Sequence, residues 1–183
     1  MSAIVSTQER IRRIQVDGDE AAFNELYALH EAKLYNFAYS LLDDREVAQE
    51  IVHDVFLKIW MGRQSLDQIR NLSVYLYVLI KNACLNHIRS VSSKKVKELQ
   101  LTEAYYFHLS VDPSQLLISK ELQAKVLMAV NGLPPRCKLI FKMIKEDDLS
   151  ANEVADILGL SNKTVFAQLA IALKKLDDVL GGK

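Results

Sequence analysis

Glu50 and His53 have the Glu-x-x-His spacing through which helices of di-iron bundle proteins hold metal ions. Such a site needs a second pair and further glutamates, but His30, His87 and His108 have no Glu three residues before them. We therefore interpret His53 as a lone exposed histidine and expect neither a metal ion nor another cofactor. The sequence also has no Gly-rich phosphate loop and no His-Glu-x-x-His motif. Because it offers no catalytic constellation, we expect a protein that is not an enzyme.

The most informative motif begins at Ser150, which forms a capping box with Glu153 and opens a short helix. Ala155 is small enough for a second helix to approach closely, and Gly159 suits a left-handed turn. Val165 would then lock the second helix onto the first. This spacing is typical of a helix-turn-helix, whose second helix enters the major groove of DNA. It favours DNA binding over the alternative, a generic helical hairpin.

The second helix of this motif divides into two faces. The predicted buried face comprises Val165, Leu169, Ala172, Leu173 and Leu176. All charged residues from 161 to 176 are lysines, which adds a little support for a nucleic-acid partner. The predicted DNA contacts are Ser161, Asn162, Lys163, Thr164, Phe166, Ala167, Gln168 and Lys174.

The N-terminal half carries two oppositely charged segments. Within 43–54, Glu50 and Asp54 lie one helical turn apart, and such a like-charge pair is unfavourable unless a basic partner binds it. The segment 81–97, by contrast, holds only basic charges. The acidic residues of the first segment are Asp43, Asp44, Glu46, Glu50 and Asp54.

Between these segments, one predicted helix interleaves aromatic, amide and basic side chains. This mixture suits melted DNA, because aromatic rings stack on unpaired bases, amides bond base edges and basic groups hold phosphates. Tyr75, Leu76 and Leu79 fit a hydrophobic core equally well, so both interpretations stay open. The interleaved residues are Tyr75, Tyr77, Lys81, Asn82, Asn86 and Arg89.

The composition is that of a folded chain of one or two domains. Of 183 residues, 50% are hydrophobic, and 23 basic residues balance 23 acidic ones. This balance argues against strong autonomous binding to nucleic acid, and no apolar run reaches the roughly 18 residues of a membrane span. No secretory signal is evident, and Cys84 and Cys137 are isolated thiols. We therefore expect a reduced, cytoplasmic protein without membrane insertion.

Helical periodicity runs through the chain, which predicts an all-α fold of two small helical domains joined by a linker. We expect an N-terminal domain at 1–92, a linker at 93–111 and a C-terminal helix-turn-helix domain at 112–183. Asp43 and Glu46 resemble a capping box before the third helix. A further helix is predicted to be capped by Asn71 or Ser73 and to continue to about Val91. The other predicted helices are about 7–16, 20–41, 45–61, 112–130, 135–145, 151–158 and 162–180.

In order and spacing, these motifs resemble a bacterial RNA polymerase sigma factor of the extracytoplasmic-function group. Asp17–Tyr27 is similar to the opening motif of the group, and Ala48–Trp60 is similar to its polymerase-binding helix. Tyr75–Arg89 resembles the promoter-melting helix. Leu133–Cys137 and the helix-turn-helix resemble the second DNA-binding domain. The resemblance covers most of 19–180, apart from the linker.

The resemblance implies an initiation factor that binds promoter DNA and the β and β′ subunits of core RNA polymerase. The loop 62–72 would lie by the minus-ten element, where an unstacked base is captured, and the last helix would read the minus-thirty-five element. The implied contacts with a basic coiled coil of β′ are Gln49, Glu50, His53, Asp54 and Lys58. The implied contacts near the minus-ten element are Asn71, Tyr75, Lys81, Asn82, Asn86, Arg89, Lys94 and Lys95.

The resemblance also implies an anti-sigma factor as regulator, and a free protein that is monomeric. The sequence departs from the group at His53, where glutamine is common. It departs again at Phe166, Ala170 and Ile171, where polar or basic residues are common. Two alternatives remain: a stand-alone helix-turn-helix regulator with a ligand-sensing N-terminal domain, and a helical interaction module that has lost DNA binding.

Overall fold

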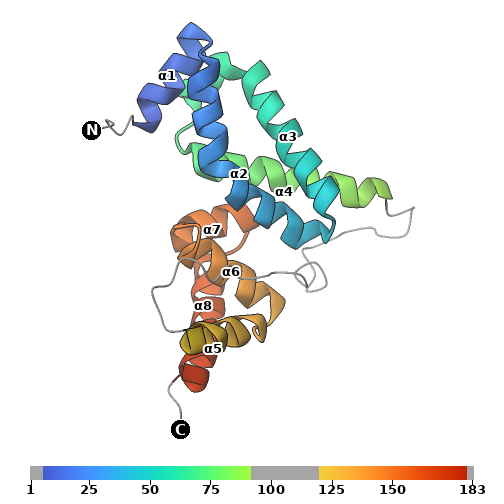
Figure 1. Cartoon of the computed structure of the whole chain (residues 1–183), viewed down its shortest axis with the longest axis vertical. Coiled ribbons are helices and arrows are strands. Elements are labelled where there is room, and N and C mark those ends of the chain that lie inside the picture. Colours follow the sequence, from blue (N-terminus) through green and yellow to red (C-terminus); the bar gives the residue numbers. More distant parts are fainter. Residues whose placement is uncertain (1–5, 92–119, 181–183) are drawn as a thin grey trace. The chain divides into compact units, whose positions relative to one another are not determined.

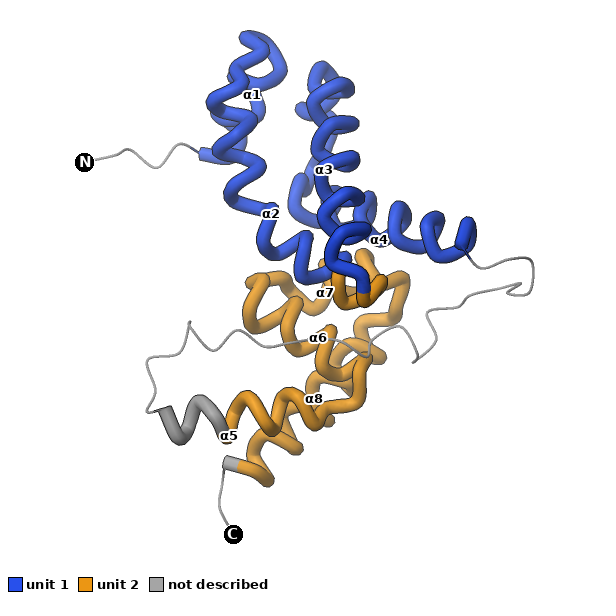
Figure 2. The backbone as a smooth tube through the Cα atoms, turned by 45° about the vertical axis from the view of Figure 1, so that its right-hand side comes forward, with its two compact units in different colours: residues 1–38, 44–93 blue, residues 39–43, 94–183 orange. Residues whose placement is uncertain are grey.

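The computed structural model describes residues 6–91 and 120–180, and every regular element in these ranges is a helix (Figure 1). The chain forms two compact units, 1–38 with 44–93 and 39–43 with 94–183 (Figure 2). The predicted all-α fold of two helical domains is therefore confirmed. The domain limits stay predictions, because the linker and the expected helix start at Asp112 lie outside the described residues.

The helices of the N-terminal part are α1 (Thr7–Asp17), α2 (Glu20–Leu42), α3 (Arg45–Met61), the 3-10 helix η1 (Arg63–Gln68) and α4 (Leu72–Val91). Those of the C-terminal part are α5 (Lys120–Asn131), α6 (Pro135–Lys145), α7 (Ala151–Leu158) and α8 (Asn162–Leu180). The ranges of α3, α6, α7 and α8 agree with those predicted. The predicted loop 62–72 differs, since its first half is η1, which packs against α1 and α3.

The turn between α1 and α2 is fixed by local polar contacts. Gly18 ends α1 in the left-handed conformation, with φ of 60°. Asp19 then accepts a hydrogen bond from the Ala22 N–H at 3.0 Å and pairs with Arg13 at 2.7 Å. These contacts, the Ala22 bond first, lower the pKa of Asp19. The start of α2 is thus capped by a charged carboxylate.

The junction of α2 and α3 corrects one prediction. Asp43 does not cap α3, because its φ of 54° is left-handed and its N–H donates to the Tyr39 carbonyl at 2.9 Å, which ends α2. An N-cap needs an extended backbone, and Asp44 has one, with φ −130° and ψ 116°. Its Oδ1 accepts from the N–H groups of Glu46 and Val47 at 3.0 and 3.1 Å.

The core of the N-terminal unit is built from one stripe of each long helix. Phe37 of α2 meets Tyr77 of α4 with ring centroids 5.1 Å apart, and Tyr77 is 1% exposed. Tyr77 is therefore a core residue, and its predicted place among the DNA-stacking aromatics is wrong.

In the C-terminal unit, α8 packs against α5, α6 and α7. Buried side chains of α5, α6 and α8 form one cluster, which is completed by the loop residue Leu133. Leu173, predicted in the buried face of α8, is 46% exposed. The cluster members are Ala129, Val130, Leu133, Cys137, Ala172 and Leu176.

Both cysteines should resist thiol reagents in the native protein. Cys84 and Cys137 are 0% and 1% exposed, and burial raises the pKa of Cys84 to about 12. At pH 8 this pKa makes the reactive thiolate fraction of Cys84 about three orders of magnitude smaller than that of an ordinary cysteine. We expect slow labelling by a disulfide-exchange reagent in buffer and rapid labelling of both thiols in denaturant. Fast native labelling would contradict the burial.

Candidate functional site

The outward face of α3 is acidic over its first half. Glu46, Glu50 and Asp54 are exposed, while Ile51 and Val55 on the opposite side are 8% and 2% exposed. Among the described side chains, those of residues 6–91 and 125–179, none forms an ion pair with Glu50 or Asp54. The like-charge pair identified in the sequence thus lacks a basic partner within the described chain. Gln49, His53 and Lys58, the other predicted contacts, are exposed as well.

The second half of α3 also exposes large apolar side chains, which were not among the predicted polymerase contacts. Leu57 and Met61 are 56% and 73% exposed. Beside them lies an aromatic groove of about 330 Å³ between α2 and α3. Ring centroids are 4.7 Å apart for Tyr27 and Phe56 and 4.9 Å apart for Phe23 and Trp60. The groove is lined by Glu20, Phe23, Asn24, Tyr27, His53, Phe56, Leu57 and Trp60.

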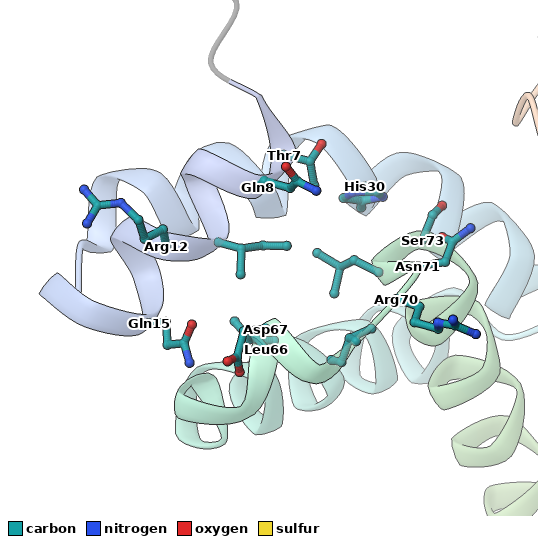
Figure 3. A pocket seen from close by; sticks show the side chains of 13 residues that line it. Thr7, Gln8, Arg12, Gln15, His30, Leu66, Asp67, Arg70, Asn71 and Ser73 are labelled. Carbon is teal, nitrogen blue, oxygen red and sulfur yellow. The ribbon is translucent and has the colours of Figure 1, made fainter.

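A second pocket, of about 610 Å³, lies between α1, η1 and the start of α4 (Figure 3). Its apolar side chains include Leu66 and Leu72, and its polar ones include Arg12, His30 and Arg70. Burial, with help from nearby positive charges, lowers the pKa of His30. A neutral imidazole can both donate and accept a hydrogen bond. The pocket therefore offers an apolar surface with donors and acceptors around it, which suits a nucleobase.

The predicted residues of α4 divide by face. At about 100° per residue, Tyr75, Asn82, Asn86 and Arg89 lie on one face of the helix. All four are exposed, and Arg89 donates to the Asn86 side-chain oxygen at 3.3 Å. Lys81 lies about 100° away from this face. It is half-buried, and burial lowers its pKa.

Two further predictions near α4 have different outcomes. Asn71 is exposed and caps α4, since its Oδ1 accepts from the Val74 N–H at 3.1 Å. This bond gives Asn71 a structural role in orienting the α4 surface. Lys94 and Lys95 lie outside the described residues.

The helix-turn-helix has the predicted local geometry. Ser150 and Glu153 form both bonds of the capping box, and Gly159 has φ of 69° in the turn. Val165 is fully buried. Ser161 caps α8 by accepting from the Thr164 N–H at 3.1 Å, and the two hydroxyls lie 2.8 Å apart. Ser161 and Thr164 thus hold the start of α8, in addition to their predicted place at the DNA surface.

Gly159→Ala should destabilise the C-terminal unit by about 1–2 kcal/mol. A Cβ at this position has no neighbour within 4 Å, so the cost is the left-handed backbone and not a clash. Urea unfolding monitored by circular dichroism would measure it. Gly132→Ala is the control, because it makes the same substitution in the same unit at a glycine whose backbone is not left-handed. A neutral Gly159→Ala would contradict the assigned strain.

The outward face of α8 lies opposite its buried stripe. It consists of Lys163, Phe166, Ala167, Ala170 and Lys174, all of which are exposed. The predicted contact Asn162 is exposed beside it.

Gln168 departs from the predicted contact set. It is partly buried, and its Oε1 accepts from Cys137 Sγ at 2.8 Å, so its side chain is directed toward α6.

Known protein families match both units of the chain. Residues 26–94 match sigma-70 region 2, and residues 123–176 match sigma-70 region 4. The chain is 24% identical to the ECF RNA polymerase sigma factor SigW of Bacillus subtilis, over 88% of this chain and 90% of that protein. It is also 24% identical to the ECF RNA polymerase sigma-E factor of Escherichia coli K12, over 97% of this chain and 96% of that protein.

Solved structures have a similar fold. CnrH in complex with the cytosolic domain of CnrY matches with a TM-score of 0.55 and 20% identity, over 93% of this chain and 95% of that one. RpoE of Bartonella quintana, in complex with the anti-sigma factor NepR, matches with a TM-score of 0.54 and 21% identity. The match covers 87% of this chain and 96% of that one.

Two helical units, one of them with a helix-turn-helix, are typical of a DNA-binding protein. The two matched regions identify it further: the chain belongs to the sigma-70 family, in its extracytoplasmic-function group. It is a promoter-recognising sigma factor, and the stand-alone regulator is not favoured. No described helix is long and apolar enough to cross a membrane.

Proposed function

We propose that this sigma factor docks on core polymerase through α3, opens promoter DNA with α4 and the neighbouring pocket, and reads the upstream element with α8. The observation that carries this proposal is the separation of surfaces within the N-terminal unit. The outward face of α3 presents Glu50 and Asp54, whereas that of α4 presents Tyr75, Asn86 and Arg89. One surface suits a basic protein, and the other suits a melted strand.

On α3, the carboxylates would pair with a basic coiled coil of β′, and Leu57 and Met61 would extend the contact into the aromatic groove. An interface with charged and apolar parts combines orientation with burial of apolar surface. Gln49, His53 and Lys58 would lie at its polar edge.

On the DNA side, Tyr75 would stack on an unpaired base, and Asn82 and Asn86 would bond base edges. Arg89 would hold a phosphate, together with Lys94 and Lys95 of the adjoining segment. Lys81, which is half-buried beside this face, would contribute charge at its edge. The pocket between α1 and η1 would receive the unstacked base of the minus-ten element.

The test is a pull-down with purified core RNA polymerase, followed by run-off transcription on a genomic promoter library. Binding together with specific start sites would support the proposal and reveal both promoter elements. A folded, inhibitor-free protein that does not bind core polymerase would refute it. Operator binding without polymerase would instead support a stand-alone regulator.

Lys163→Ala should weaken use of the upstream element by about tenfold. Lys163 lies in the first turn of α8, where a lysine reaches a base edge or phosphate of the major groove. Run-off transcription with templates that differ only in the upstream sequence would measure the loss. Lys145→Ala, at an exposed lysine of α6, is the control. Equal activity of Lys163→Ala and the parent on all templates would contradict this role.

The proposed function also concerns the location, the oligomeric state and the regulation of the protein. It acts in the cytoplasm as a non-enzymatic factor, is a monomer when free, and is held by an anti-sigma factor until induction. Support for the anti-sigma factor comes from similar solved structures, since the sigma factor RpoE is in complex with the anti-sigma factor NepR, and CnrH is in complex with the cytosolic domain of CnrY. Domain limits at residues 92 and 111 are part of the proposal.

A further inference from the structure

The outward face of α8 has an apolar centre. Phe166 is 56% exposed, and Ala167 and Ala170 are exposed beside it. Val165 and Ala172, on the opposite side of the same helix, are both fully buried. The exposed apolar strip is therefore not part of the packing that holds α8 in place. It lies on the side of the helix that a major groove would receive.

Lysines stand at both ends of this strip. Lys163 and Lys174 are exposed and eleven positions apart, which corresponds to about 16 Å along the axis at 1.5 Å per residue. A major groove is about 12 Å wide, so the two ammonium groups can reach phosphates on either side of it. The neighbouring Lys175 instead donates to the Gly132 carbonyl at 3.2 Å. Positive charge at both ends of the strip favours DNA over an apolar protein as its partner.

Polar groups that could read bases are scarce at the centre of this face. Gln168 is directed toward Cys137, at 2.8 Å, and Ser161 and Thr164 bond each other at the start of the helix. The middle of the face thus presents carbon to the DNA. The major groove displays one apolar group, the 5-methyl of thymine, which phenylalanine and alanine side chains contact.

We propose that Phe166, flanked by Ala167 and Ala170, recognises thymine 5-methyl groups in the upstream promoter element. This inference rests on the proposed function, in which α8 enters the major groove at that element. It names what the helix reads there: thymine methyls in the centre, with phosphates bound by Lys163 and Lys174. Specificity would then come from apolar contact instead of bidentate hydrogen bonding.

Replacing thymine by deoxyuridine tests this directly, because it removes the methyl and keeps base pairing and the O4 acceptor. The full chain bound to core polymerase is titrated against labelled promoter duplexes, in which each upstream thymine is replaced in turn. We expect about fourfold weaker binding at one or more positions, which corresponds to the loss of one buried methyl group.

Phe166→Ala should bind the thymine promoter more weakly by a similar factor and no longer distinguish thymine from deoxyuridine at that position. Phe166→Leu, which keeps an apolar side chain, should retain part of the discrimination. Val179→Ala is the matched control, because Val179 is an exposed apolar residue near the far end of α8, 47% exposed. It should bind and discriminate like the parent.

Two results would overturn the inference. The parent holoenzyme could bind thymine and deoxyuridine duplexes equally, or Phe166→Ala could keep the discrimination. If Phe166→Ala keeps the discrimination but binds both duplexes more weakly, Phe166 makes another contact. Replacement of the whole upstream element separates the two proposals: if binding falls but no deoxyuridine position matters, only methyl recognition fails. If binding is unchanged, the proposed role of α8 fails, and this inference fails with it.

Discussion

Asp54→Lys should weaken binding of core RNA polymerase by about 100-fold. Asp54 is exposed on the acidic face of α3, one turn from Glu50. If that face meets a basic surface, the substitution exchanges an attraction for a repulsion, which amounts to about 3 kcal/mol for a close pair. Titration of labelled core polymerase at low and physiological salt would measure the change. The affinity of the parent should fall with salt more steeply than that of the variant.

Asp17→Lys is the matched control for this experiment. It makes the same charge change at an exposed residue that ends α1, outside the α3 surface. Its affinity for polymerase should stay close to that of the parent. Asp54→Asn should cause an intermediate loss, since it removes the attraction without adding repulsion. Parent-like affinity of a folded Asp54→Lys would remove α3 from the interface.

Helix limits were predictable because their signals are local. The capping box of Ser150 and Glu153 and the left-handed Gly159 lie within a few residues of the ends that they fix. The error at Asp43 has the same local origin. Two adjacent aspartates offer the same side-chain chemistry, and only the backbone decides that Asp43 ends α2 while Asp44 caps α3.

The faces of single helices could also be predicted from the sequence, whereas contacts between helices could not. The 3.6-residue period places Glu50 with Asp54, but it cannot show that Tyr77 packs on Phe37, forty positions away. The same holds for Gln168, whose side chain bonds Cys137 of another helix. Long-range packing decides which polar and aromatic side chains remain available to a partner.

The aromatic groove beside α3 is the clearest example of a site that needed the structure. Besides the imidazole of His53, its rings occur as two pairs with a spacing of four, Phe23 with Tyr27 and Phe56 with Trp60. That spacing predicts one face on each helix. Only the packing of α2 against α3 brings the two faces together, with Phe23 and Phe56 centroids 6.2 Å apart. A buried residue of this groove should therefore contribute much more to stability than Leu57, which lines the groove but is exposed.

Phe56→Ala should destabilise the N-terminal unit by about 3–5 kcal/mol, because Phe56 is 2% exposed and its loss leaves a cavity. Leu57→Ala, one position on and 56% exposed, should change stability by no more than about 0.5 kcal/mol, yet weaken polymerase binding. Trp60 is the only tryptophan, so its fluorescence in urea reports this unit alone. Equal stability of the two variants would contradict the packing of α2 on α3. Unchanged polymerase binding by Leu57→Ala would confine the docking surface to the carboxylates.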